Sequence, residues 1–150
     1  MIVGVHHTSR TVSDLDRSLA FYRDLLGMPV ELDTEMQGEM LEREVAMPGA
    51  HLRICLLRTG ADTVLELLQY LQPVGTPFPA GVRPADVGTH HVALLVADIR
   101  ASYDALTRAG VEFTYPPQEV DAGYFRGHWT AYCYDPDRLI VELWQLPAGG

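Results

Sequence analysis

The 150-residue sequence contains no lysine and no asparagine, and all 11 of its basic residues are arginine. A Schiff-base mechanism and the phosphate-binding lysine of a P-loop are therefore excluded. Acidic residues number 20, which gives a formal net charge of −9 and leaves no basic stripe for a phosphate backbone. The sequence thus argues against nucleic acid as a partner.

Long apolar runs are also absent from the sequence. The longest uncharged apolar run, residues 92–97, is far shorter than the roughly 20 residues of a transmembrane helix. The two cysteines, Cys55 and Cys133, lie in alternating apolar segments, where buried free thiols are usual. We therefore expect a cytoplasmic protein that has no disulfide and does not associate with membranes.

An internal repeat organises the chain. The pattern His-His-x(4)-Val-x-Asp occupies residues 6–14 and returns at residues 90–98, and each occurrence follows a glycine. Each half also ends on the pattern Glu-Leu-x-Gln, at residues 66–69 and 142–145. Because both motifs recur in the same order, the sequence indicates a duplicated module.

Each half predicts the element order βαβββ. Apolar residues at helical spacing lie between an N-cap signal at Asp14 and a stop signal at Gly27, and the second half repeats these signals at Asp98 and Gly110. We expect strands in the first half at residues 29–32, 40–46, 51–57 and 64–70, with a turn at 59–62. We expect strands in the second half at 111–115, 129–134 and 139–145, a long loop at 116–126 and a frayed tail at 147–150.

A stretch rich in proline and glycine, residues 72–87, can sustain neither a helix nor a central strand. We therefore expect residues 1–71 to form the first module and residues 88–150 the second, joined by this linker in one α+β domain.

One histidine and one glutamate occupy matched positions in each half. Alternate residues of a strand share a face, so His7 lies with Ser9 while His6 turns away. The two glutamates stand among apolar neighbours, where an unpaired carboxylate is costly and a divalent cation would compensate its charge. We expect the ligands to be His7, Glu66, His91 and Glu142, with one or two positions open for a substrate.

Each of these four residues has a simpler interpretation when it is taken singly. A lone histidine on a strand is usually a hydrogen-bonded structural residue, and a strand glutamate often faces solvent. The recurrence of the set in both halves favours the cation site. We expect His6 and His90 to be structural.

These residues resemble the vicinal oxygen chelate superfamily, which includes glyoxalase I, methylmalonyl-CoA epimerase, extradiol dioxygenases and antibiotic-resistance proteins. The marks are the His7-x(4)-Val12-x-Asp14 opening and its second copy, the Glu66 and Glu142 segments, and Asp135-Pro136-Asp137 before the latter. The resemblance implies paired βαβββ modules forming a cupped half-barrel sheet, commonly in a homodimer. It places one divalent ion (Zn, Ni, Co, Mn or Fe) on the four residues named above.

The expected reaction is removal of a proton beside a carbonyl, followed by its return, as in an isomerase, epimerase or lyase. The resemblance is closest to methylmalonyl-CoA epimerase and glyoxalase I, although the epimerase usually has Gln where Glu66 stands. The candidate bases are Glu142, acting by leaving the metal, and Glu44.

Two other functions stay open. An iron-dependent extradiol dioxygenase would use nearby histidine and tyrosine side chains, and a non-catalytic binding protein would trap a small molecule against aromatic rings. Either function, like the isomerase, would use a pocket of aromatic residues. The candidates for its lining are Tyr124, His128, Trp129, Tyr132 and Trp144.

Overall fold

The structure is a computed structural model that describes residues 1–60 and 63–147. The turn expected at residues 59–62 and the tail expected at 147–150 include residues outside this part of the chain.

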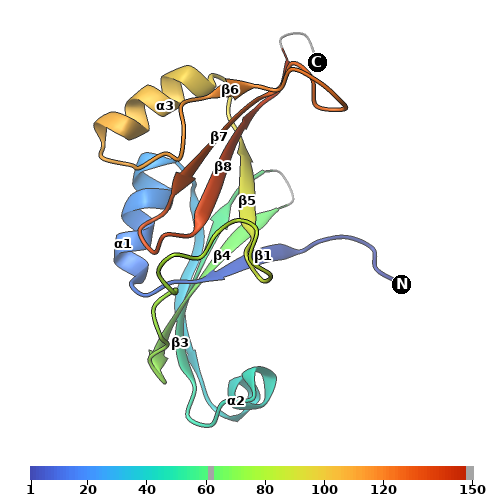
Figure 1. Cartoon of the computed structure of the whole chain (residues 1–150). Coiled ribbons are helices and arrows are strands. Elements are labelled where there is room, and N and C mark those ends of the chain that lie inside the picture. The colour runs from blue at the N-terminus through green and yellow to red at the C-terminus, as the bar shows by residue number, and fades with distance from the viewer. Residues whose placement is uncertain (61–62, 148–150) are drawn as a thin grey trace. The chain divides into compact units, whose positions relative to one another are not determined.

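Two compact units make up the chain: unit 1, Met1–Pro77, and unit 2, Phe78–Gly150 (Figure 1). Unit 1 contains β1 (His7–Thr11), α1 (Leu15–Leu19), the π-helix η1 (Ala20–Leu25), β2 (Val30–Gln37), α2 (Glu39–Val45), β3 (His51–Arg58) and β4 (Val64–Gln72). Unit 2 contains β5 (His91–Leu95), α3 (Ile99–Arg108), β6 (Gln118–Glu119), β7 (Trp129–Tyr134) and β8 (Ile140–Gln145). The expected α+β class and βαβββ order are confirmed, with α2 added in unit 1.

The two sheets have the same topology. Their strand orders are β1-β4-β3-β2 and β5-β8-β7-β6. In each sheet the first strand pairs in parallel with the last strand of the unit, and the other pairs are antiparallel. The register is also repeated, because Ser9 lies beside Glu66 in unit 1 and Ala93 lies beside Glu142 in unit 2. The two copies of the sequence repeat thus have the same strand order and the same pairing register around the glutamate.

The glutamine of the Glu-Leu-x-Gln pattern holds the start of the helix in each unit. Gln69 Oε1 accepts a hydrogen bond from the Leu15 amide at 3.0 Å, and Gln145 Oε1 accepts one from the Ile99 amide at 2.7 Å. Residues three apart on a strand point to opposite faces. The pattern therefore sends its glutamine to the helix side of the sheet and its glutamate to the other face.

The helix side of each sheet forms the main core. α1 contacts β4, and α3 contacts β7 and β8. Leu65 and Leu67, which flank Glu66, are fully buried, and so is Val141 before Glu142. Burying such side chains is the main source of stability, so the core fixes which face each glutamate must take.

The strand expected at residues 40–46 is wrong, because these residues belong to the helix α2. Leu41 and Val45, four residues apart, lie on one side of that helix and pack with Leu52 and Ile54 of β3. This second apolar cluster lies on the sheet face opposite α1. The helical spacing of the two apolar residues, rather than strand alternation, was the informative signal.

The strand expected at residues 111–115 is also wrong. The only pairing in this segment is an isolated bridge between Phe113 and Cys133, within the described residues. The second strand of unit 2 is instead the two-residue β6, which lies in the segment expected to be a loop.

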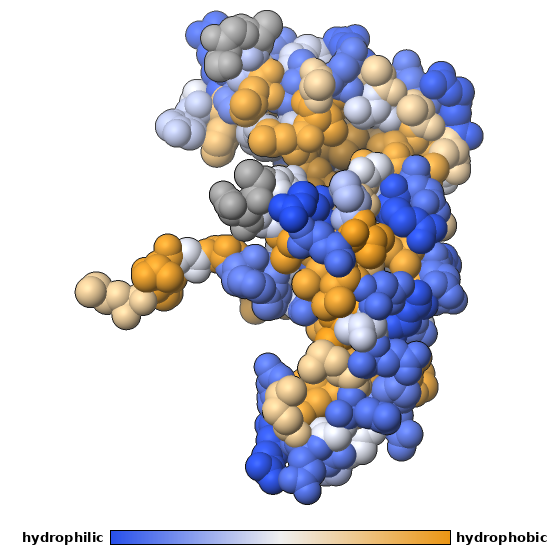
Figure 2. All heavy atoms as spheres, turned by 180° about the vertical axis from the view of Figure 1, so that it is seen from behind, coloured by the Kyte–Doolittle hydropathy of each residue, from blue (hydrophilic) through white to orange (hydrophobic). Residues whose placement is uncertain are grey.

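The N-terminal segment before β1 is extended and projects from unit 1 (Figures 1 and 2). Its Ile2, Val3 and Val5 side chains are exposed. In the described part of the chain, no helix combines the length and the apolar character needed to cross a bilayer.

Candidate functional site

In unit 1, β1 and β4 bring His7 against Glu66. The Nε2 atom of His7 lies 3.5 Å from Oε2 of Glu66. The other ring nitrogen, Nδ1, lies 2.8 Å from Nδ1 of His6, so one of the two rings donates a hydrogen bond to the other. His6 therefore contacts the site residue instead of turning away from it, which sequence reasoning missed.

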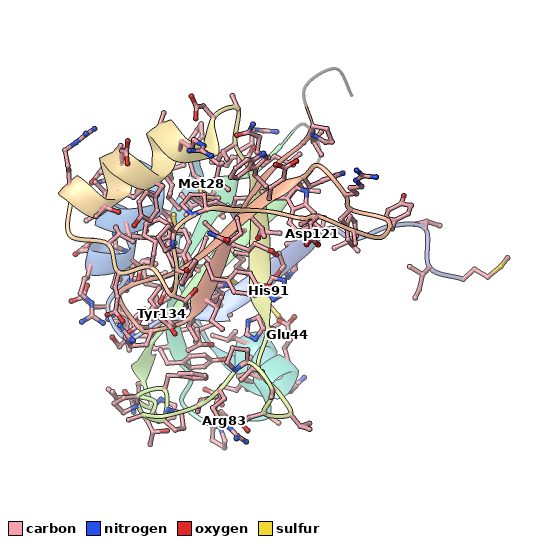
Figure 3. All side chains as sticks on the ribbon, turned by 45° about the horizontal axis from the view of Figure 1, so that its top comes forward. Met28, Glu44, Arg83, His91, Asp121 and Tyr134 are labelled. Atoms are coloured by element: carbon pink, nitrogen blue, oxygen red, sulfur yellow. The ribbon has the colours of Figure 1, made fainter. Side chains whose placement is uncertain are left out.

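In unit 2, β5 and β8 form the matching pair, His91 and Glu142 (Figure 3 labels His91). The His91 Nε2 atom lies 3.1 Å from Oε2 of Glu142. The Glu142 side chain is only 7% exposed, whereas the imidazole is about half exposed. A carboxylate that is nearly buried and faces one open imidazole is suited to binding a cation that approaches from the imidazole side.

Two hydroxyl-bearing side chains of β7 surround Glu142. Thr130 Oγ1 donates a hydrogen bond to Glu142 Oε1 at 2.6 Å. Tyr132 pairs with Glu142 across the strands, and its ring lies 5.4 Å from the His91 ring. Burial raises the pKa of the Tyr132 phenol, and the negative charge of Glu142 and a hydrogen bond to it raise the pKa further. Tyr132 therefore lies at the site as a neutral phenol. Sequence reasoning missed Thr130, although strand alternation places it on the Tyr132 face.

An aromatic cluster lies beside this pair on unit 2. Trp144 shares the face of Glu142, and its Nε1 donates a hydrogen bond to His128 Nδ1 at 2.7 Å. Phe125 packs edge-on against both rings. Because indole can only donate, His128 must accept at Nδ1 and carry its proton on Nε2, where it can donate to a ligand. Phe125 was not among the residues expected in the pocket.

Tyr124 and Trp129 lie apart from this cluster. Tyr124 is 93% exposed and touches Phe125 only by its edge. Trp129 pairs with Gln145 and stacks under Arg100 of α3, with the guanidinium carbon 4.5 Å from the ring centre. Trp129 is therefore on the helix side of the sheet, opposite to Glu142.

Glu44 projects from α2 and is exposed (Figure 3). Among the described residues of unit 1, it has no recorded hydrogen bond or ion pair with His7 or Glu66. A base must reach the proton that it removes. Within unit 1, the structure therefore brings Glu66, but not Glu44, to His7.

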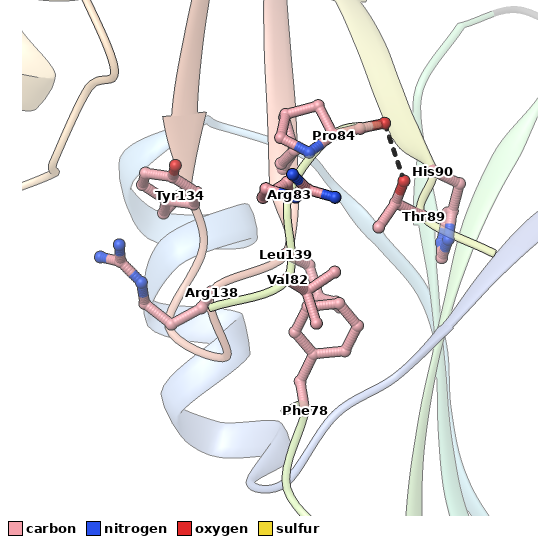
Figure 4. Close-up of a pocket in the computed structure, with 10 residues that line it drawn as sticks. Phe78, Val82, Arg83, Pro84, Thr89, His90, Tyr134, Arg138 and Leu139 are labelled. Carbon is pink, nitrogen blue, oxygen red and sulfur yellow. Dashed lines mark hydrogen bonds between the residues drawn. The ribbon is translucent and has the colours of Figure 1, made fainter. Parts of the chain in front are cut away.

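His90, the neighbour of His91, lines a separate small pocket of unit 2 (Figure 4). The pocket has a volume of about 30 Å³ and is closed by Phe78, Val82 and Leu139. This volume accommodates a water molecule but not a substrate. His90 thus lies outside the candidate site.

The donors present fit a divalent cation. Imidazole nitrogen and carboxylate oxygen are ligands that zinc, nickel, cobalt, manganese and iron all accept. Within either unit the structure assembles two such donors, and no group of three or more His, Cys, Asp or Glu side chains among the described residues is arranged to hold a metal ion. Each unit therefore brings together one imidazole and one carboxylate.

Comparison with known proteins agrees with these features. A model of the Glyoxalase/Bleomycin resistance protein/Dioxygenase superfamily matches residues 4–143. The chain is 34% identical to a 2-epi-5-epi-valiolone epimerase from Actinomyces, over 98% of this chain and 81% of that protein. It is 31% identical to a probable lactoylglutathione lyase from Vibrio parahaemolyticus, over 93% of this chain and 88% of that protein. The fold matches a glyoxalase family protein from Bacillus cereus with a TM-score of 0.84 and 19% identity, over 99% of this chain and 97% of that one.

Proposed function

Because the chain belongs to the Glyoxalase/Bleomycin resistance protein/Dioxygenase superfamily, we propose that it is a metal-dependent epimerase that removes and returns a proton beside a carbonyl group. The carrying observation is the repeated pair: in each unit an imidazole Nε2 faces a carboxylate oxygen from the same cross-strand position. His7, Glu66, His91 and Glu142 are the proposed ligands of one divalent ion.

A bound divalent ion supplies Lewis-acid stabilisation of the negative charge that develops on a carbonyl oxygen. The chain's own residues supply the proton transfer. A ligand carboxylate, Glu66 or Glu142, would take the proton from the carbon beside the carbonyl. The carboxylic acid so formed would return a proton to that carbon after the carbon, now planar, has turned its other face toward the acid. Glu44 is not chosen as this base, because it is exposed on α2 and, among the described residues of unit 1, has no hydrogen bond or ion pair with His7 or Glu66.

The proposed substrate class is a small hydroxylated cyclic ketone. The Actinomyces relative is named for the epimerisation of 2-epi-5-epi-valiolone. In this chain the rings of Phe125 and Trp144 lie on the sheet face of Glu142 and offer apolar surfaces for stacking. His128, with its proton on Nε2, can donate to a substrate hydroxyl. Tyr132, whose phenol forms a hydrogen bond with Glu142, can accept a hydrogen bond from a substrate hydroxyl.

The proposal is tested by proton exchange in deuterated water. The protein is loaded with Co²⁺ and incubated with 2-epi-5-epi-valiolone, and proton NMR follows the signals beside the carbonyl. We expect those signals to be lost and the epimer to appear, with no oxygen uptake. Omission of the metal is the control.

Three other outcomes would overturn this assignment. Conversion of the methylglyoxal–glutathione adduct without ketone epimerisation would make the protein a lyase, as the Vibrio relative is named. Oxygen consumption with a catechol would make it a dioxygenase. Tight binding of the ketone with no exchange would make it a binding protein.

A homodimer, implied by the family resemblance, is part of the same proposal. Sedimentation of the metal-loaded protein at several concentrations tests it. A mass of 16.7 kDa at every concentration would contradict the dimer.

A further inference from the structure

Glu66 has apolar side chains beside it on the sheet of unit 1. Leu56 is its partner across β3 and β4, and Ile54 faces Leu68 one pair further along. Neither Leu56 nor Ile54 can donate a hydrogen bond. Among the described residues of unit 1, the recorded polar partner of Glu66 is His7, whose Nε2 lies 3.5 Å from Oε2. The second oxygen, Oε1, is therefore not fixed by unit 1, and the carboxylate can rotate between side-chain conformers.

Glu142 differs at the two matching positions of unit 2. There Tyr132 takes the place of the leucine and Thr130 takes the place of the isoleucine. The Thr130 hydroxyl donates to Oε1 at 2.6 Å, a short hydrogen bond of the kind made to a charged acceptor. The other oxygen, Oε2, stays directed at His91. Both carboxylate oxygens of Glu142 are thus held by unit 2.

We propose that Thr130 is a positioning residue that makes Glu142 the fixed ligand and leaves Glu66 as the carboxylate free to turn toward a substrate. This inference rests on the proposed function, in which both glutamates bind the ion. Hydrogen bonds from outside the ligand set orient carboxylate ligands and strengthen metal binding. The duplicated modules have therefore become unequal at two strand positions, Tyr132 against Leu56 and Thr130 against Ile54, and Thr130 is the residue that donates to Oε1 of Glu142.

The test compares Co²⁺ affinity, measured by titration calorimetry, across matched variants of the full chain. Thr130→Val keeps the side-chain shape and removes the hydroxyl, and we expect Co²⁺ affinity to fall about 10- to 100-fold. Thr130→Ser restores the hydroxyl and should restore the affinity. Ile54→Val, a comparable change at the matching position of unit 1, should leave Co²⁺ affinity unchanged.

Two further readouts separate positioning from folding. The absorption spectrum of bound Co²⁺ reports its ligand geometry, and we expect it to change in Thr130→Val but not in Thr130→Ser or Ile54→Val. Thermal unfolding of the metal-free variants shows whether each is folded. Glu142→Gln should lower Co²⁺ affinity more than Glu66→Gln, because it removes the fixed carboxylate.

The outcomes separate this inference from the function on which it rests. If the wild-type chain binds no Co²⁺, the proposed metal-dependent function fails and the inference fails with it. If the wild type binds and Thr130→Val binds equally well with the same spectrum, Thr130 has no positioning role while the proposed function stands. The inference is also overturned if Thr130→Ser is as weak as Thr130→Val, or if Glu66→Gln loses more affinity than Glu142→Gln.

Discussion

The two site histidines show how one motif can acquire different surroundings. In unit 1 the Nδ1 atom of His7 is occupied by His6, so Nε2 is the nitrogen left for a cation. In unit 2 the ring of His91 instead lies beside Tyr132, and His90 turns to a separate pocket. The same His-His sequence therefore provides a supporting neighbour in one half and a pocket-lining residue in the other.

We predict a graded series for substitutions of these histidines, measured as Co²⁺ bound per chain after gel filtration. His7→Ala and His91→Ala should each abolish Co²⁺ retention, because each removes a ligand. His6→Ala should weaken binding by about tenfold, since it frees the His7 ring without removing the ligand. His90→Ala is the control and should retain Co²⁺ as the wild type does. Equal losses in His90→Ala and His7→Ala would contradict the proposed roles.

At the scale of the elements, the Glu-Leu-x-Gln segment of each unit contacts both the candidate site and the start of the helix. The last strand carries a glutamate on one face and, three residues later, a glutamine on the other, where it accepts the first helical amide. Leu15 and Ile99 are almost fully buried, so their amides could not turn to water without these glutamines. The glutamine thus stabilises the helix, and the strand holds the glutamate at the site.

We predict that Gln69→Ala and Gln145→Ala each lower the free energy of unfolding by about 1 kcal/mol, because each leaves a buried amide unsatisfied. Urea unfolding followed by circular dichroism measures the change. Gln37→Ala, on the exposed edge strand β2, is the matched control and should shift stability by less than about 0.5 kcal/mol. Indistinguishable midpoints for all three variants would show that the helix starts are held by other contacts.

The elements also show what strand periodicity could and could not predict. Alternation showed which residues of each strand share a face with its histidine or glutamate, because that requires only that the segment be a strand. Cross-strand register then set each histidine on the face of its glutamate. The same alternation separates Trp129 from Tyr132, and the structure places Trp129 under Arg100. The segment of α2 was misread because a short apolar pattern suits either a strand or a helix, and packing on β3 decided between them.

At the scale of the whole molecule, the two units each enclose one cysteine. Cys55 lies in β3 of unit 1 and Cys133 in β7 of unit 2, and both side chains are fully buried. Burial raises the pKa of the Cys55 thiol to about 11, so its thiolate is scarce at neutral pH. Reaction of either thiol with a reagent therefore requires that the unit around it open.

We predict that a thiol reagent at pH 8 labels neither cysteine of the native protein within minutes and labels both in urea. Reaction needs solvent contact and thiolate. The native fold denies solvent contact to both thiols, and burial also raises the pKa of the Cys55 thiol. Peptide mass spectrometry resolves which unit has been labelled. Rapid labelling of native Cys55 or Cys133 would show that the corresponding unit opens easily.

The sequence by itself determined the duplication, the order of elements in each half and the pairing of one histidine with one glutamate, because repeats and strand alternation are local properties of the chain. Only the tertiary structure decided which neighbour each glutamate received. Cross-strand register set Thr130 against Glu142 and left Glu66 among apolar side chains. The loop before β7 brought His128 to Trp144. The register of the strands and the path of this loop depend on packing between distant segments, so residue spacing alone does not encode them.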